Sequence, residues 1–145
     1  MGAGRKREVV LLDTGPLVAF LNRTDRHHEW TIAQWERLHP PLLTCEAVIA
    51  EACFLLRAHP GGGQAVLQLL DREVLQIAFD LEAEAESVAT FLGRYGNVPM
   101  SLADACLVRM AERHTKSRIL TLDGDFRIYR KHRRQVIPTT MPQGQ

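Results

Sequence analysis

The sequence predicts an α/β fold, a three-layer α/β/α sandwich around a mostly parallel central sheet. Short apolar runs without alternation, typical of strands covered on both faces, recur along the chain, and helical patterns separate them. With 145 residues, 46% hydrophobic and 24% charged, the chain has the length and composition of one folded domain. We therefore expect a single domain over residues 1–145, with flexible ends at 1–7 and 139–145.

The strands are predicted from their apolar character and from what ends them. Val9–Leu12 is apolar throughout and stops at Asp13, and a similar run over 119–122 stops at Asp123. In chain order the expected strands are 9–12, 42–44, 74–79, 119–122 and, as an edge strand, 136–137.

Capping signals predict the helices between these strands. Pro16 suits the first turn of a helix, and Ser101 with Asp104 three residues later is typical of a capping box. In chain order the expected helices are 16–21, one N-capped by Asp25 that ends before Pro40, one capped by Thr44 that reaches about residue 58, a short one at 64–70, one from Leu81 through Leu92, and one from Ser101 to about His114.

Asp13 and Asp123 both follow predicted strands. In open α/β sheets, ligands bind beyond the carboxyl ends of the strands, so both acids are expected at such a location. Each is also typical of a turn or an N-cap. Their repetition after two apolar strands favours a site.

Glu51 lies among nine apolar residues in the segment Ala47–Leu56. A helix that is apolar all round is buried, and a buried carboxylate costs several kcal/mol unless it is paired, hydrogen-bonded or bound to metal. The alternative is a narrow solvent-facing stripe or a salt bridge. We expect a buried, functional carboxylate.

Asp104 has two compatible roles. As the third residue of its helix it can complete the capping box with Ser101, and a helix N-terminus can also hold a site carboxylate rigidly.

Asp13, Glu51, Asp104 and Asp123 therefore form a candidate site of four acids from separate segments. No histidine or cysteine accompanies them at metal-ligand spacing, and oxygen-only ligands favour Mg²⁺ or Mn²⁺. One or two divalent cations would relieve the mutual repulsion of the carboxylates. Such clusters activate water and neutralise phosphate charge, so phosphodiester hydrolysis is the leading chemistry.

These segments together resemble the PIN domain family, over nearly the whole chain. The resemblance rests on VVLLDTGPLVAFL, AVIAEA, SLADACLVRMA and ILTLDGDF, which contain the four acids in the family's order. The compact length resembles VapC-type ribonuclease toxins. The resemblance implies a metal-binding cluster of Asp13, Glu51, Asp104 and Asp123, with Asp13 and Asp104 as direct ligands. It also implies supporting roles for Thr121 and Asp125, a homodimer, and a cognate antitoxin partner.

The sequence departs from the family pattern at the first acid. Many relatives carry Ser or Thr two residues after it, whereas this chain has Gly15 there and a hydroxyl on Thr14, which becomes a candidate supporting group. Asp123 and Asp125 both suit the role of fourth acid. We favour Asp123, which directly follows the strand.

The charge outside the candidate site is basic. The net charge is only +1, but without the five acids discussed above 18 basic residues face 12 acidic ones. Arg127, Arg130 and Lys131 are candidates for phosphate contacts, and Tyr129 beside them could stack a base. A solvated surface or an antitoxin-binding surface is the alternative.

We expect a cytoplasmic protein that does not enter the membrane. Its three cysteines have no disulfide or zinc-ribbon spacing, and no apolar run is long enough to span a bilayer. The predicted function is a Mg²⁺- or Mn²⁺-dependent endoribonuclease acting as a toxin. The alternatives are a catalytically silent RNA- or protein-binding module of the same fold and a small metal-dependent phosphatase.

Overall fold

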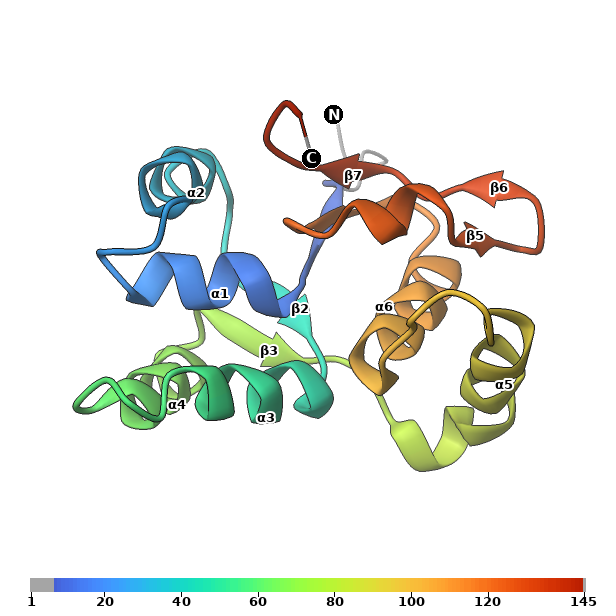
Figure 1. Ribbon diagram of the computed structural model, residues 1–145, viewed down its shortest axis with the longest axis horizontal. Helices are drawn as coiled ribbons and strands as arrows, with labels where there is room; N and C mark the ends of the chain where they lie inside the picture. The colour runs from blue at the N-terminus through green and yellow to red at the C-terminus, as the bar shows by residue number, and fades with distance from the viewer. Residues whose placement is uncertain (1–6, 145) are drawn as a thin grey trace, which may run out of the picture.

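The computed structural model describes residues 7–144 (Figure 1). The strands are β1 Val9–Leu12, β2 Leu42–Thr44, β3 Leu75–Ile77, β4 Ser117–Leu120, β5 Arg130–Lys131, β6 Gln135–Val136 and β7 Thr139–Thr140. The helices are α1 Thr14–Leu21, α2 His28–Trp35, α3 Glu46–Leu55, α4 Gly62–Asp71, α5 Leu81–Arg94 and α6 Leu102–Arg113, with a 3₁₀ helix at Gly124–Arg127. No helix within this part of the chain is both long and apolar enough to cross a bilayer.

The main sheet has five strands in the order β3-β2-β1-β4-β7, and every neighbouring pair is parallel. Val9–Leu12 pairs along its length with Ser117–Leu120, so β1 and β4 form the centre of the sheet. Leu11, Leu12, Ile119 and Leu120 are almost completely buried. The central strands are thus covered on both faces, as their unbroken apolar sequence predicts.

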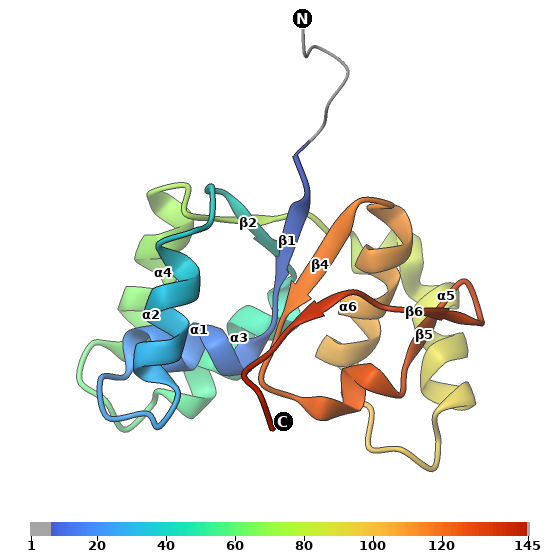
Figure 2. The ribbon, with the colours of Figure 1, turned by 90° about the horizontal axis from the view of Figure 1, so that it is seen from above.

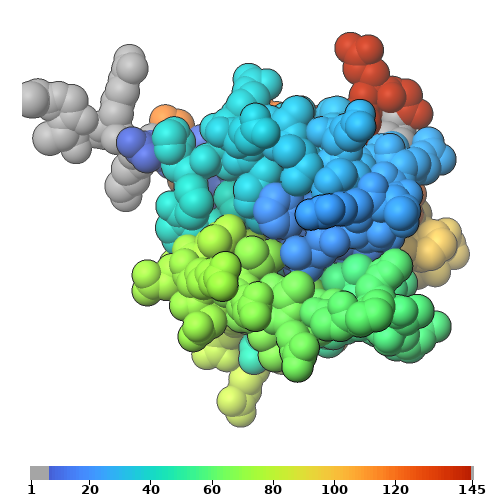
Figure 3. All heavy atoms as spheres, turned by 90° about the vertical axis from the view of Figure 1, so that its left-hand side faces the viewer, coloured from blue at the N-terminus to red at the C-terminus, as the bar shows by residue number. Residues whose placement is uncertain are grey.

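Helices cover both faces of the sheet. The chain steps outward from β1 to β2 and β3, then returns past β1 to β4. Because parallel crossovers are right-handed, this reversal places the later helices on the opposite face. Figure 2 shows α1–α4 on one side of the sheet and α5 and α6 on the other, and Figure 3 shows the first group from outside. The predicted three-layer α/β/α architecture is confirmed.

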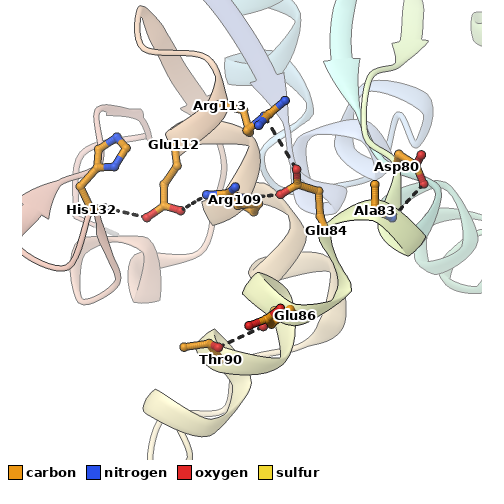
Figure 4. A network of polar contacts seen from close by, with 9 residues as sticks. All are labelled: Asp80, Ala83, Glu84, Glu86, Thr90, Arg109, Glu112, Arg113 and His132. Carbon is orange, nitrogen blue, oxygen red and sulfur yellow. Dashed lines mark hydrogen bonds and ion pairs between the residues drawn. The ribbon is translucent and has the colours of Figure 1, made fainter.

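A network of charged side chains joins α5, α6 and the β5–β6 hairpin (Figure 4). Arg109 donates hydrogen bonds to Glu84 on α5 and to Glu112 on its own helix. The other oxygen of Glu112 accepts a hydrogen bond from the backbone N–H of His132, at 2.7 Å. This contact holds the β5–β6 hairpin against α6. At the tip of the hairpin, His132 and Arg133 have left-handed backbone conformations, with φ of 49° and 71°.

Two predicted caps differ from the structure. Helix α2 begins at His28 because the Asp25 side chain instead accepts a hydrogen bond from the backbone of His27 within a turn. Helix α3 has Cys45 as its N-cap, while the Thr44 hydroxyl donates to the carbonyl of Leu12 on the neighbouring strand, at 2.9 Å. The capping box of Ser101 and Asp104 on α6 is confirmed, since both of its hydrogen bonds are present.

The C-terminal segment also differs from expectation. Val136 lies in β6, which pairs antiparallel with β5 in a separate two-stranded sheet. The edge of the main sheet is β7, because Thr139 and Thr140 pair with Ile119 and Leu120. The expected flexible end at 139–145 must therefore be corrected for its first two residues. Of the other expected flexible end, residues 1–6 lie outside the described chain, as does residue 145.

Candidate active site

The sheet reverses its winding direction beside β1, between β1 and β4. The carboxyl ends of the strands at such a switch point diverge, which is where open α/β sheets bind ligands. Asp13 directly follows β1. Strand β4 ends at Leu120, slightly earlier than predicted, and Thr121 and Asp123 lie in the loop that leaves it.

An open pocket of about 500 Å³ at this edge brings the four predicted acids together. Its lining comprises Asp13, Thr14, Gly15, Glu51, Leu55, Pro99, Ser101, Asp104, Leu122 and Asp123. The acids come from the end of β1, the middle of α3, the first turn of α6 and the loop after β4. No basic side chain is among these lining residues.

Asp13 is the N-cap of α1 and is only 6% exposed. One carboxylate oxygen, Oδ1, accepts a hydrogen bond from the backbone N–H of Thr14 at 2.7 Å. The other, Oδ2, accepts one from the Thr121 hydroxyl at 2.6 Å. Burial raises the pKa of Asp13 to about 7, although both hydrogen bonds oppose the rise and the nearby charges of Asp104 and Asp123 add to it.

Asp104 is held at the N-terminus of α6 and is 7% exposed. Its Oδ2 accepts hydrogen bonds from the Ser101 backbone and from the Tyr129 hydroxyl, both at 3.2 Å. Burial raises the pKa of this carboxyl, and the charge of Asp123 raises it further. Burial likewise raises the pKa of the Tyr129 phenol, so Tyr129 stays protonated and donates.

Asp123 occupies the loop after β4 and is partly exposed. It caps the 3₁₀ helix by accepting a hydrogen bond from the backbone of Asp125 at 2.9 Å, and its own N–H donates to the Thr121 hydroxyl at 2.9 Å. Thr121 therefore contacts both strand-end acids. Of the two candidates for the fourth acid, Asp123 lines the pocket, and Asp125 is not among its lining residues.

Glu51 lies on an exposed face of α3, not in the buried position that its apolar neighbours suggested. Helix α3 buries Val48, Ile49 and Ala52, whereas Glu51 is exposed and Leu55, one turn later, is 50% exposed. The expectation of burial was wrong because this helix is apolar on its solvent side too. Glu51 nevertheless lines the same pocket as the three aspartates.

The chemistry of these donors fits a divalent cation of the Mg²⁺ or Mn²⁺ type. All are oxygens, the carboxylates repel one another, and the bonds from the Ser101 N–H and the Tyr129 hydroxyl to Asp104 both fall on Oδ2 rather than Oδ1. Within residues 7–144, no three acid, histidine or cysteine side chains are close enough to enclose an ion by themselves. Water and substrate oxygens would complete the coordination shell, as is usual for Mg²⁺.

Thr14 has a buried hydroxyl with no hydrogen-bond partner in the structure. The residue is 4% exposed and lines the pocket, so its hydroxyl is available to a bound group. Gly15 follows, where relatives were expected to carry a hydroxyl. A Cβ at Gly15 would lie 3.3 Å from Leu122, so the missing side chain allows α1 to approach the loop after β4 closely.

The three basic residues predicted to contact nucleic acid differ in availability. Arg127 is exposed. The Arg130 guanidinium donates to the carbonyls of Arg127, Ile128 and Tyr129, and Lys131 is only 7% exposed. Their contacts with RNA stay a prediction.

Tyr129 requires a correction. Its ring is completely buried against Tyr95 and Phe126, so it cannot stack a base as suggested. Its contact with Asp104 had no sequence signal, because the two residues are 25 positions apart and no spacing rule joins a loop tyrosine to a helix N-terminus.

The raised pKa of Asp13 makes the stability of the metal-free protein depend on pH. The folded chain binds this proton more tightly than the unfolded chain, whose pKa is near 3.8. The resulting stabilisation is complete below about pH 4 and is lost as the pH rises through about 7.

In EDTA, we expect Asp13→Asn to be more stable than wild type at about pH 8, by about 1–3 kcal/mol. Its free energy of unfolding should also decline less steeply between about pH 4 and pH 7. Urea unfolding at several pH values measures this difference. Asp71→Asn, at an exposed acid outside the pocket, should decline as wild type does, and an equally steep decline in Asp13→Asn would contradict the assignment.

The family model described as "PIN domain" matches residues 10–131. No curated protein matches the chain significantly. Among solved structures, Mycobacterium tuberculosis VapC20 is similar, with a TM-score of 0.67 and 21% sequence identity over 80% of this chain and 91% of that one. That protein is described as a toxin that cleaves the sarcin-ricin loop.

The likeness to VapC20 supports the fold, and the family match extends from β1 through β5, which includes all four acids. The resemblance drawn from the sequence is confirmed: this chain belongs to the PIN domain family.

Proposed function

We propose that this PIN-domain protein is a metal-dependent endoribonuclease that hydrolyses RNA phosphodiester bonds, and that it is the toxin of a type II toxin–antitoxin pair. The observation that carries the proposal is the convergence of Asp13, Glu51, Asp104 and Asp123 on one open pocket at the switch point of the sheet. The similar fold of VapC20, which is described as a toxin that cleaves the sarcin-ricin loop, supports the proposal.

The four acids divide into two buried and two more accessible groups. Asp13 and Asp104, each hydrogen-bonded and nearly inaccessible to solvent, would hold Mg²⁺ or Mn²⁺. Glu51 and Asp123 line the more exposed part of the pocket, where they can orient water beside a bound phosphate. The cation supplies charge neutralisation at the phosphate and acidifies water. Thr121 fixes Asp13, and the unpaired Thr14 hydroxyl is available to a phosphate oxygen.

RNA must also be attracted to an acidic pocket without basic lining residues. Arg127 is exposed at the end of the 3₁₀ helix that begins after Asp123, so it is the basic residue best placed to contact a phosphate near the site. We propose Arg127 as the principal phosphate contact of the three predicted basic residues. Arg130 and Lys131 would contribute less, since one is bonded to backbone carbonyls and the other is buried.

The partners we propose are RNA, a cognate antitoxin and a second copy of the chain. Phe54 and Leu55 are 59% and 50% exposed on α3, and Leu55 lines the acidic pocket. An apolar surface beside a functional pocket is typical of a protein-binding site, so an antitoxin that covers it would also block the acids. A cytoplasmic location agrees with the three free cysteines.

Cleavage of a labelled total RNA pool tests the activity. Purified protein free of antitoxin should produce discrete fragments with Mn²⁺ or Mg²⁺ and none with EDTA. Because loss of a group that merely orients a metal ligand costs about 10–100-fold, Asp13→Asn or Asp104→Asn should reduce the rate at least about 100-fold. Glu51→Gln and Asp123→Asn should also reduce it.

Matched acids provide the controls for this experiment. Glu46→Gln changes an exposed acid on the same helix as Glu51 but outside the pocket lining, and Asp125→Asn keeps the backbone N–H that contacts Asp123. Glu46→Gln should retain wild-type activity, and Asp125→Asn, at a residue with a predicted supporting role, should lose less activity than Asp123→Asn. No cleavage by folded wild-type protein with any divalent metal would favour the silent binding module instead.

The salt dependence of RNA binding tests the role of Arg127. Each phosphate contact contributes to the slope of log affinity against log salt, so Arg127→Gln should lower the magnitude of that slope by roughly 0.7–0.9. Binding is measured by fluorescence anisotropy in an Asp104→Asn background to prevent cleavage. Arg23→Gln, at an exposed arginine between α1 and α2, should leave the slope unchanged, and an equal effect in both variants would exclude a specific contact at Arg127.

Growth on induced expression tests the toxin role. Wild-type protein should arrest a bacterial host, Asp13→Asn at an equal protein level should not, and co-expressed antitoxin should restore growth. Normal growth with active, wild-type enzyme present would show a ribonuclease that is not a toxin.

A further inference from the structure

One segment, Thr121–Tyr129, contacts or supplies three of the four acids. The Thr121 hydroxyl donates to Asp13, Asp123 lies two residues later, and the Tyr129 hydroxyl donates to Asp104. Asp13 and Asp104 lie on elements separated by most of the chain. The segment therefore links these two acids through side-chain hydrogen bonds.

Hydrogen bonds within this segment fix its shape. The backbone N–H of Asp123 donates to Thr121, and the N–H of Asp125 donates to Asp123. The N–H of Tyr129 donates to the carbonyl of Asp125 at 3.1 Å, which returns the chain toward α6. The position of Tyr129 is thus determined by the same turn that places Asp123.

The Tyr129 ring is held rigidly. It is completely buried, with its centroid 5.1 Å from that of Tyr95 and 5.3 Å from that of Phe126, both in edge-on contact. Such packing leaves the hydroxyl little freedom. Its possible acceptors are Asp104 Oδ2 at 3.2 Å and the Pro99 carbonyl at 3.4 Å, and the carboxylate is both closer and the stronger acceptor.

The capping box alone does not orient Asp104 toward the other acids. Ser101 belongs to the same helix end, so its N–H fixes the carboxylate relative to α6 only. Tyr129 fixes the same oxygen, Oδ2, relative to the loop that leaves β4. Both of these bonds are accepted by Oδ2, so neither of them occupies Oδ1.

We propose that Tyr129 is a positioning residue of the acidic pocket, which acts through Asp104 by holding Oδ2 so that Oδ1 is presented to a divalent cation. The inference rests on the proposed function, because the orientation of Asp104 affects metal affinity only if Asp104 binds metal. Tyr129 itself is buried and does not touch substrate.

Metal affinity in two matched variants tests this role. Tyr129→Phe removes only the hydroxyl and keeps the packed ring. Tyr95→Phe is its control, since that hydroxyl accepts a hydrogen bond from the backbone of Arg130 and does not contact an acid. Isothermal titration with Mn²⁺ should show affinity about tenfold lower for Tyr129→Phe, as for other groups that orient a metal ligand, and unchanged affinity for Tyr95→Phe.

A second measurement uses the unsubstituted chain, which has only two tyrosines. Protein labelled with 3-fluorotyrosine gives two fluorine resonances, and the Tyr95→Phe variant assigns them. Titration with diamagnetic Mg²⁺ should shift the Tyr129 resonance more than that of Tyr95. If Tyr129→Phe does not fold, this measurement still tests whether Tyr129 is coupled to metal binding.

The outcomes separate this inference from the function on which it rests. Equal Mn²⁺ affinity of Tyr129→Phe and wild type, an equal loss in both tyrosine variants, or a Tyr129 resonance insensitive to Mg²⁺ would overturn the positioning role alone. Wild-type protein that binds neither ion would overturn the metal-dependent function and this inference together.

Discussion

The burial of like charges at the end of β1 is the constraint on which the site depends. Asp13 and Asp104 are each more than nine-tenths buried, and the nearby charge of Asp123 raises the pKa of both. An ionised carboxylate in such surroundings costs several kcal/mol unless it is compensated. This pocket has no basic lining residue, so hydroxyl and backbone donors provide the compensation. They reduce the cost without neutralising the charge, which leaves the site suited to a cation.

These donors lie at or near the N-termini of helices. Asp13 caps α1, Asp104 lies in the first turn of α6, and Asp123 caps the 3₁₀ helix. Free N–H groups at a helix N-terminus favour a negative charge, so each aspartate gains stabilisation from the element that positions it. Capping and a role in the site were alternatives for single residues in the sequence. In the structure one carboxylate has both roles, because the hydrogen bonds of the cap also fix the direction in which the carboxylate points.

Local patterns predicted those features that depend on local physics. Val9–Leu12, the Ser101–Asp104 capping box and the strand-end positions of Asp13 and Asp123 follow from apolar runs and spacing. Glu51 lines the pocket but is exposed rather than buried, since burial cannot be inferred for α3 when its solvent face is also apolar. The two-residue strands β6 and β7 are too short to carry a pattern, so the edge strand was expected at 136–137, whereas β7 at Thr139–Thr140 forms the edge of the main sheet. The Tyr129–Asp104 bond depends on tertiary packing alone.

The distribution of hydrogen bonds indicates which acids are fixed and which can adjust. Both oxygens of Asp13 are bonded, Asp104 is bonded through Oδ2, and no hydrogen bond to the carboxylate of exposed Glu51 is found in the structure. Fixing a side chain in advance removes its entropy cost from ligand binding, whereas an exposed glutamate must lose rotamer freedom each time. Fixed, buried aspartates with an exposed glutamate at the rim would therefore suit the proposed function: the pocket would keep its geometry for a small cation and admit a larger, variable substrate from the side of α3.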